Sequence, residues 1–335
     1  MSADRIGVVI IGRNEGARLI ACFESFDAIG CEVVYVDSGS TDGSPQAAAS
    51  RGASVVNLDL SAPFTAARAR NAGYAALKIR NPDIQFIQFV DGDCVFARDW
   101  FAKARAFLAS RPDVAVVCGR RRERHPTASV YNALCDIEWD TPIGETDACG
   151  GDALVRADAF GAVGGYRAQL IAGEEPELCL RLRERGWKIW RLDAEMTGHD
   201  AAIMHFSQWW ARSVRCGHAY AEVVWLHRKS RFAIWKTNAI RAAAWGGMLP
   251  LVIVAAAMAN RFALLGVFVY GLQVSRLALR RGPAERFSWI YAALTTLAKP
   301  AECLGMAKYA WRRIFRQPAV IIEYKGRPGP TRIGG

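Results

Sequence analysis

Short apolar runs and longer amphipathic stretches alternate along the first third of the chain. A run of about four to eight apolar, β-branched or aromatic residues is typical of a buried strand. Such runs occupy residues 6–11, 32–36, 53–58, 85–90 and 114–119. Small and apolar residues at helical spacing predict helices from about residue 15, over residues 65–78 and over residues 99–110. Strands separated by single helices indicate an α/β fold with a doubly wound, mostly parallel sheet.

A different pattern begins at residue 173, where a glycine and two acidic residues precede apolar residues at helical spacing. Pro176 suits the first turn of a helix, so we expect Glu174 and Glu175 at a helix N-terminus. The helix dipole favours carboxylates there, and capping alone would contribute about 0.3–1 kcal/mol. Capping does not require two consecutive acids, so a chemical role is the competing interpretation. His199 follows a strand-like run at residues 187–192, and a lone histidine is more often packed than bound to metal.

The last third contains the most apolar part of the chain. Residues 242–259 and 262–275 are uncharged, and only Asn260 and Arg261 separate them. Because about 20 apolar residues span a membrane, these runs predict a membrane hairpin over about residues 242–278, with a buried helical pair as the alternative. Beyond Pro300, basic and apolar faces predict a basic amphipathic helix over about residues 301–316. We therefore expect an α/β domain over residues 1–225 and a helical region over residues 226–335.

The positive charge is concentrated behind these apolar runs. The formal net charge of the 335 residues is +11, and residues 276–335 hold 12 Lys and Arg against 3 Asp and Glu, a net charge of +9. Basic residues that flank apolar segments fit an anionic membrane surface better than nucleic acid. The nine cysteines stand singly, and the run at residues 6–11 is too short for a signal peptide. We therefore expect the cytoplasmic face of the inner membrane.

Carboxylates follow two of the expected strands directly. Asp37 ends the second strand, and Asp91 and Asp93 come straight after residues 85–90. Ligands of parallel α/β sheets bind at the carboxyl ends of the strands, although a solvated turn would also accommodate these acids. The chain contains neither G-x-G-x-x-G after the first strand nor a G-x-x-x-x-G-K-[ST] loop. A metal ion, rather than a glycine-rich loop, would then have to hold any bound phosphates.

Six segments, in this order, resemble those of glycosyltransferase family 2, whose fold is called GT-A. They are VVIIGRNEG (8–16), VDSGSTDGS (36–44), ARNAG (69–73), DGD (91–93), GGDALVRADAF (150–160) and GEEPELCLRLRERGW (173–187). The resemblance covers roughly residues 6–220. It implies a GT-A-type sheet and an enzyme that moves one sugar from a nucleotide-diphosphate sugar donor to a hydroxyl group of a lipid-linked or saccharide acceptor.

The resemblance also implies a donor site. It would place Asp37 at the nucleobase and Asp91 near the ribose, and Gly150 would help to shape the edge where donor sugar and acceptor meet. The full set of implied donor-binding residues is Gly12, Arg13, Asp37, Arg70, Asp91, Asp93, Gly151 and Asp152.

The catalytic residues and the cofactor come from the same resemblance. Glu175 aligns with the base that deprotonates the acceptor hydroxyl, and Glu174 with a residue nearer the donor sugar. Asp93, with Asp91 and His199, would hold Mg²⁺ or Mn²⁺, hard cations that prefer oxygen ligands. Direct displacement at the anomeric carbon would invert its configuration.

The chain departs from the family pattern in two places. Glu174-Glu175 stands where Glu-Asp is usual, and Ser38 replaces an acid that often follows the aspartate of the second strand. The Gln-x-x-Arg-Trp signature of processive synthases is also absent, which favours transfer of a single sugar. Two alternatives are a nucleotidyltransferase on a similar sheet and a catalytically inactive scaffold anchored in the membrane.

Overall fold

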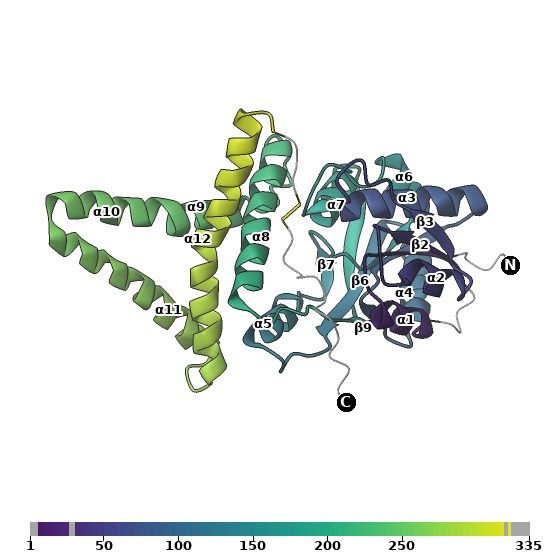
Figure 1. The fold of residues 1–335 in the computed structure, drawn as a ribbon, viewed down its shortest axis with the longest axis horizontal. Coiled ribbons are helices and arrows are strands. Elements are labelled where there is room, and N and C mark those ends of the chain that lie inside the picture. Colours follow the sequence, from purple (N-terminus) through teal and green to yellow (C-terminus); the bar gives the residue numbers. More distant parts are fainter. Residues whose placement is uncertain (1–5, 27–30, 318–320, 323–335) are drawn as a thin grey trace. The chain divides into compact units, whose positions relative to one another are not determined.

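The computed structural model describes residues 6–26, 31–317 and 321–322. These residues divide into two compact units: most of the first lies before Ile203, and most of the second runs from Ile203 onward. The first is an α/β sheet domain and the second is helical (Figure 1). The sequence predicted that the α/β domain ends at residue 225. The division at residue 203 is one of packing and does not test where the functional domain ends, so that boundary stays a prediction. Residues 323–335, the last part of the basic segment, lie outside the described residues.

One mixed sheet of nine strands forms the centre of the first unit, counted over the described residues. Its order is β3-β2-β1-β4-β8-β6-β9-β5, with β7 paired to β9. The strands are β1 (Ile6–Gly12), β2 (Glu32–Asp37), β3 (Ser54–Asn57), β4 (Phe86–Asp91), β5 (Cys94–Phe96), β6 (Val114–Glu123), β7 (Gly144–Thr146), β8 (Ala153–Arg156) and β9 (Lys188–His199). Strands β1 to β4 pair in parallel, and β8 inserts antiparallel between β4 and β6. The predicted α/β fold with a mostly parallel sheet is confirmed.

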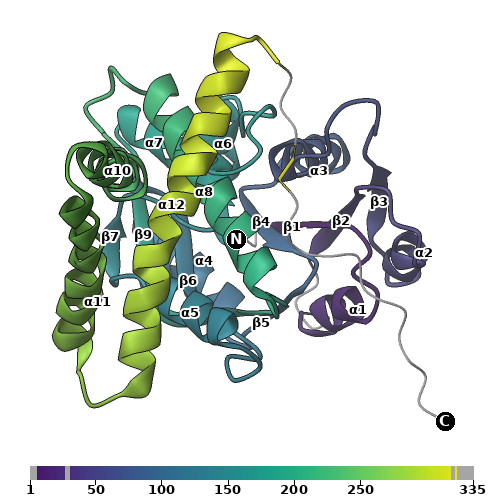
Figure 2. The same cartoon turned by 60° about the vertical axis from the view of Figure 1, so that its left-hand side comes forward.

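Helices cover both faces of this sheet, with α3 on one face and α1 on the other (Figures 1 and 2). The first unit contains α1 (Ala17–Glu24), α2 (Ser44–Ala49), α3 (Ala66–Arg80), α4 (Trp100–Ser110), α5 (Val130–Glu138), α6 (Ala157–Ala162) and α7 (Glu174–Glu184). The core is built from the apolar runs of the strands, in which Val8, Val34 and Phe89 are fully buried. This burial explains why short, β-branched runs predicted these strands.

Two strands are longer than the sequence pattern predicted. The run at residues 114–119 continues to Glu123 in β6, and the run at residues 187–192 continues to His199 in β9. The extensions pair with each other in parallel, Arg121 opposite Thr197 and Glu123 opposite His199. Pairing between the two strands thus keeps the polar residues of both extensions in an extended conformation, although their residue types alone do not predict a strand.

Helix α3 lies unusually close to the sheet. A Cβ atom on Gly73 would stand 2.3 Å from Cγ1 of Val9, so only glycine permits this approach. Thr65 caps the helix, since its hydroxyl oxygen accepts a hydrogen bond from the Arg68 backbone N–H and its O–H donates to the Ala168 carbonyl. The close, capped helix fixes Arg70 near the carboxyl ends of the strands.

The second unit is built around two long helices that lie side by side, α8 and α12 (Figure 2). Gly217 of α8 and Gly305 of α12 bring the two backbones together, because a Cβ on either would stand within 2.0 Å of the other helix's carbonyl oxygen. The elements of this unit are α8 (Phe206–Leu226), α9 (Lys236–Ala243), the π-helical η2 (Ala244–Met248), α10 (Leu249–Ala259), the 3-10 helical η3 (Arg261–Val267), α11 (Phe268–Arg281) and α12 (Arg286–Ile314).

Two continuous helical stretches, Lys236–Ala259 and Arg261–Arg281, form a hairpin in the second unit (Figure 1). They are 24 and 21 residues long and apolar enough to cross a membrane, which weakly indicates membrane association. The chain turns at Asn260, as expected, and its side chain accepts a hydrogen bond from the Phe262 backbone N–H at 3.0 Å. Only 6% of each apolar window is buried, so this pair of helices is not a buried core.

The predicted helix over about residues 301–316 was placed too far along the chain. The structure has a single helix, α12, from Arg286 to Ile314, with Pro300 inside it. Proline disfavours helix at the residue before it, which is why the sequence suggested a start after Pro300. Tertiary packing overrides this preference, because Gly246 of η2 approaches so closely that a Cβ there would lie 2.1 Å from the Lys299 carbonyl oxygen.

Gly73 provides a test of the packing of α3. We expect Gly73→Ala to lower the free energy of unfolding by about 1–2 kcal/mol, because overpacking against Val9 exceeds the gain in helix propensity. The control is Gly271→Ala, which also removes a glycine inside a helix but meets nothing within 4 Å. The control should be neutral or stabilising by up to about 1 kcal/mol. Urea unfolding followed by circular dichroism measures both, and equal stabilisation would contradict the close approach.

Candidate active site

The strand ends place the predicted donor residues side by side. In the register of the sheet, Gly12 of β1 lies opposite Asp37 of β2, and Ile11 lies opposite Asp91 of β4. The Ser38 backbone N–H donates to the Gly12 carbonyl at 3.0 Å, and the Gly92 N–H donates to the Ile11 carbonyl at 2.8 Å. One carboxyl edge of the sheet therefore carries Gly12, Asp37 and Asp91 together, as ligand sites of such sheets require.

Asp37 holds the turn that follows β2. Its Oδ2 atom accepts hydrogen bonds from the backbone N–H groups of Gly39 and Ser40, at 2.9 and 2.8 Å, and the Tyr35 hydroxyl donates to Oδ1. Burial and the Asp37 carboxylate raise the pKa of Tyr35, so the phenol stays protonated and remains a donor. Asp37 is 4% exposed. Its carboxylate thus stabilises the conformation of this loop through contacts within the protein itself.

Arg13 takes a more open position than the other predicted donor residues. It is exposed, and its guanidinium group lies over the Phe64 ring, 4.5 Å from the ring centroid. This stacking leaves the charged edge of Arg13 accessible at the end of β1.

Arg70 connects three carboxylates. Its Nη1 atom donates to Glu174 at 3.0 Å and to Glu175 at 2.8 Å, and its Nη2 atom donates to Asp91 at 2.8 Å. The Arg70 side chain is 2% exposed, and its guanidinium group also lies 5.6 Å from the centroid of the Tyr166 ring. A buried cation needs such partners, because an unpaired charge would cost several kcal/mol. The sequence predicted Arg70, Asp91, Glu174 and Glu175 as site residues, and the structure brings them together.

The environment separates the proton affinities of these carboxylates. Burial and the neighbouring Glu174 raise the pKa of Glu175 to about 7, although Arg70 opposes the shift. Desolvation tends to raise the pKa of Asp91, whose side chain is 29% exposed, but Arg70 and Arg121 outweigh it and lower this pKa below the ordinary value. Asp91 therefore stays ionised while Glu175 gains or loses a proton near neutral pH. Two carboxylates with divergent pKa values are typical of acid–base sites.

Asp152 lies in a second buried network, which involves a residue that the sequence analysis missed. The Arg121 side chain meets both Asp152 oxygens, with Nη2 2.7 Å from Oδ1 and Nε 3.0 Å from Oδ2. The Thr197 hydroxyl donates to Oδ2 at 2.6 Å, and the Cys94 thiol lies 3.4 Å from the same atom. Asp152 is fully buried, so these contacts balance its charge. The only hint in the sequence was the charged extension of β6.

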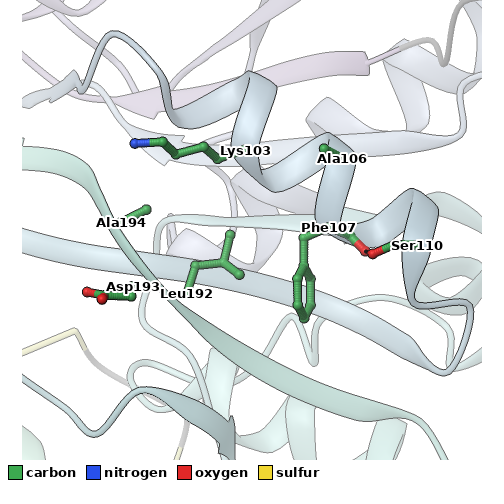
Figure 3. A pocket seen from close by; sticks show the side chains of 7 residues that line it. All are labelled: Lys103, Ala106, Phe107, Ser110, Leu192, Asp193 and Ala194. Atoms are coloured by element: carbon green, nitrogen blue, oxygen red, sulfur yellow. Dashed lines mark hydrogen bonds between the residues drawn. The ribbon is translucent and has the colours of Figure 1, made fainter.

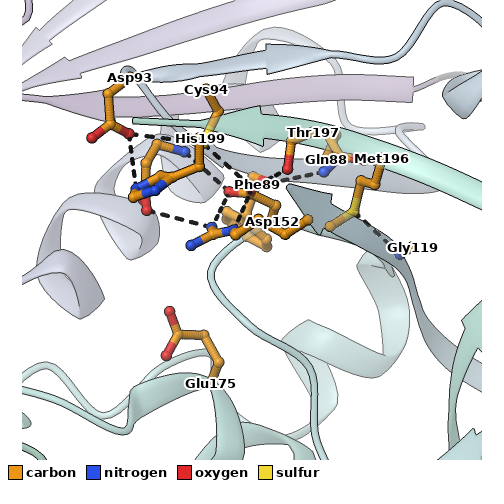
Figure 4. A network of polar contacts seen from close by, with 12 residues as sticks. Gln88, Phe89, Asp93, Cys94, Gly119, Asp152, Glu175, Met196, Thr197 and His199 are labelled. Carbon is orange, nitrogen blue, oxygen red and sulfur yellow. Dashed lines mark hydrogen bonds and ion pairs between the residues drawn. The ribbon is translucent and has the colours of Figure 1, made fainter. Parts of the chain in front are cut away.

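The structure groups Asp93, Cys94 and His199 as possible metal ligands (Figure 4). One ligand atom from each lies within 4.8 Å of the others, and Nε2 of His199 is 3.4 Å from Oδ1 of Asp93. Cys94 and His199 are neighbours because β5 pairs antiparallel with β9. A carboxylate and an imidazole fit a divalent transition cation such as Mn²⁺. Asp91 is held by Arg70 instead, so its predicted role as a metal ligand stays a prediction.

Gly151 lies directly against the Arg70 cluster. A Cβ at this position would stand 2.6 Å from Nη2 of Arg70, 3.1 Å from Oε1 of Glu175 and 3.3 Å from Oδ2 of Asp91. A Cβ on Gly150 would meet nothing within 4 Å. The backbone at Gly151 thus forms a wall of the candidate site, and Figure 4 shows the Glu175 carboxylate directed from α7 toward the Asp152 side of this site.

A hollow of about 450 Å³ between α4 and β9 is a different feature (Figure 3). Its lining includes Lys103, Phe107 and Asp193 but none of the carboxylates described above. It offers no cluster of groups for acid–base or metal chemistry, so the carboxyl edge of the sheet remains the candidate site.

Comparisons with known proteins show which family and fold this sheet domain resembles. Residues 7–162 match the family described as Glycosyl transferase family 2. The mannosyltransferase PcManGT from Pyrobaculum calidifontis, solved in complex with GDP-Man and Mn²⁺, is similar with a TM-score of 0.64 and 18% identity, over 92% of this chain and 88% of that one. GalNAc-T7, solved with UDP, GalNAc and Mn²⁺, has a TM-score of 0.54 and 16% identity, over 74% of this chain and 52% of that one.

No curated protein sequence matches the chain significantly. The family match covers β1 to α6, which include Asp37, Arg70, Asp91, Asp93 and Asp152, and the structural likeness extends over the rest of the sheet. Residues 7–162 thus match a glycosyltransferase family 2 domain, and the first unit has a GT-A-type fold.

Proposed function

We propose that this protein transfers one sugar, with inversion, from a nucleotide-diphosphate sugar to a hydroxyl group of a lipid-linked or saccharide acceptor. The observation that carries the proposal is Arg70, which joins Asp91 on the donor side to Glu174 and Glu175 on the other. Two structural neighbours were solved with nucleotides and Mn²⁺, which supports a nucleotide donor and a divalent cation, Mg²⁺ or Mn²⁺. One neighbour was solved with GDP-Man and the other with UDP and GalNAc.

The donor would lie along the carboxyl edge of the sheet. Gly12, Arg13 and the Asp37 turn would receive the nucleobase, Asp91 would lie near the ribose, and Gly151 and Asp152 would border the sugar. Asp93 and His199 would hold the divalent cation, with Cys94 beside them. The cation would supply charge stabilisation for the diphosphate leaving group.

Glu175 is proposed as the general base. It would accept the proton of the acceptor hydroxyl while that oxygen attacks the anomeric carbon and the diphosphate leaves from the opposite side. Its raised pKa suits this task, because a base works best when its pKa is close to the working pH. Arg70 is a positioning residue here, since its hydrogen bond at 2.8 Å orients the Glu175 carboxylate. Glu174 would act nearer the donor sugar.

Glu175→Gln is the first test of this proposal. The amide keeps the size of the side chain but cannot accept the proton, so we expect sugar transfer to fall by at least about a hundredfold. Donor affinity should be nearly unchanged, since the donor contacts lie elsewhere. Transfer measured with saturating donor and acceptor checks this expectation. Glu174→Gln is the matched control and should reduce transfer less; the reverse order would assign the base to Glu174.

The pH dependence of transfer gives a second, independent test. With a pKa of about 7, Glu175 gains its proton-accepting form as pH rises, so kcat/KM should increase up to about pH 7 and then level off. The raised pKa also means that Glu175 favours the folded state below its ordinary value of 4.5, and this stabilisation is lost as pH rises toward 7. Both dependences should disappear in Glu175→Gln, and a transfer profile that is flat from pH 5 to 8 in the wild type would contradict the assignment.

The cation site is tested by Asp93→Asn. Removing one carboxylate ligand should weaken Mn²⁺-dependent binding of a nucleoside diphosphate by at least about tenfold. Isothermal titration of the nucleoside diphosphate with and without Mn²⁺ measures this effect. Asp99→Asn makes the same change on an exposed side chain and should leave binding unaltered. Equal metal dependence in Asp93→Asn and in the wild type would move the cation elsewhere.

We also propose that the apolar hairpin anchors the protein at the cytoplasmic face of the inner membrane. The support is two apolar helices that are 6% buried, flanked by Lys236, Arg280 and Arg281. Apolar insertion resists salt, whereas attraction to anionic lipid does not. We therefore expect the full chain to stay in the membrane pellet in about 1 M salt. The control is a wash at about 0.1 M salt, roughly tenfold lower in ionic strength. A chain that ends at Ile240 should be released; a salt-released full chain would contradict insertion.

A further inference from the structure

Two cysteines are in contact beside the candidate site. The Sγ atoms of Cys149 and Cys179 lie 3.5 Å apart, although the two residues are 30 positions apart in the sequence. Both are free thiols in the structure. Cys179 is fully buried, whereas Cys149 is half-buried and can be reached from solvent. A disulfide has an S–S length of about 2.0 Å, so closing this pair needs a relative movement of about 1.5 Å.

Both cysteines are attached to parts of the site that matter for the proposed chemistry. Cys179 follows Glu175 by four residues on α7, so both side chains lie on one face of that helix. Cys149 precedes Gly151 by two residues, and Gly151 forms the wall against Glu175 and Arg70. The thiol pair therefore joins the helix of the proposed base to the loop that borders its carboxylate.

The Cys149 thiol is protonated at neutral pH. The contact with Cys179 and burial raise the pKa of Cys149 well above its ordinary value, so the thiolate that attacks an oxidant is scarce. Oxidation is therefore slow at neutral pH and faster in alkaline solution. Because its thiolate is scarce, Cys149 does not behave as a reactive nucleophile. The slow oxidation fits a thiol pair that forms a disulfide under sustained oxidising conditions.

We propose that Cys149 and Cys179 are a modification site, a dithiol that a low-molecular-weight disulfide oxidises to an intramolecular disulfide that suppresses sugar transfer. One protein thiolate attacks the small disulfide and releases one small thiol, and the second protein thiol then displaces the other. The protein loses two electrons and two protons, and the small disulfide becomes two thiols. The effect on transfer rests on the proposed function, whereas formation of the disulfide does not.

The disulfide would act through position rather than through chemistry at the substrate. It would draw the loop before Gly151 toward α7 by about 1.5 Å, into the space beside Glu175 where the acceptor hydroxyl must approach. Displacements of about 1 Å in an active site can cost about a hundredfold in rate. Oxidation should therefore reduce transfer more strongly than it reduces binding of the donor, whose proposed nucleobase and cation contacts lie at the ends of β1 and β2, in the turn before β5 and on β9.

The experiment treats the purified full chain with oxidised glutathione at pH 8. Mass spectrometry of the peptides should find Cys149 joined to Cys179, and sugar transfer should fall by at least about tenfold and return with dithiothreitol. Absence of this peptide under conditions that oxidise other cysteines, or a Cys179 link to Cys118 instead, would overturn the proposal of a modification site. A complete Cys149–Cys179 disulfide with unchanged transfer would overturn its effect on activity.

Matched variants separate this site from the other cysteines. Cys149→Ser and Cys179→Ser should each make transfer insensitive to oxidised glutathione, relative to the reduced form of the same variant. Cys216→Ser, which changes a half-buried cysteine in α8, should keep the full sensitivity of the wild type. If the protein proves to transfer no sugar, the joined peptide still tests the dithiol, so the two proposals fail independently.

Discussion

A single buried cation holds the candidate site together. Arg70 donates to Asp91, Glu174 and Glu175 at 2.8 to 3.0 Å, and these acids come from β4 and from the first turn of α7. Without that guanidinium group, Glu174 and Glu175 would lose the cation that pairs with both, and Asp91 would keep Arg121, whose Nη2 atom is 3.7 Å away. The planar shape and several donors of Arg70 allow it to serve three partners at once, which a lysine could not do in the same geometry.

The rest of the first unit can be understood as support for this one side chain. Arg70 reaches the carboxyl edge because α3 lies close to β1 at Gly73, and it meets Glu175 because Gly151 leaves room for its guanidinium group. Arg121 plays a parallel role one strand away, where it neutralises Asp152. Both arginines act on Asp91 and lower its pKa, whereas burial and Glu174 raise that of Glu175 against the effect of Arg70, so the two pKa values diverge.

The sequence predicted those features that depend on local patterns. Short apolar runs located β1, β2 and β4, and acids directly after them located the carboxyl edge. Gly173, Glu174 and Pro176 located the start of α7. The sequence also located the turn of the apolar hairpin at Asn260, because two uncharged runs separated by a short polar break are visible in the sequence itself.

The features that the sequence missed depend on contacts between distant residues. Arg121 meets Asp152, 31 positions away, only because β6 and β9 extend beyond their apolar runs. Cys94 joins Asp93 and His199 through strand pairing, which no motif records. The start of α12 was wrong because packing against Gly246 carries the helix through Pro300. In each case a tertiary contact overrides or extends what the local sequence prefers.

The balance of charge in this cluster has a consequence for the order in which ligands bind. Five carboxylates, those of Asp91, Asp93, Asp152, Glu174 and Glu175, share the region with two guanidinium groups, those of Arg70 and Arg121. The surplus is negative even when Glu175 carries a proton, so the site by itself repels a free diphosphate. For the donor proposed above, a divalent cation would cancel that repulsion, so the binding species would be the metal–nucleotide complex, or the nucleotide after the metal. Occupancy would then follow the concentration of the complex, and excess free nucleotide would compete for the metal instead of filling the site.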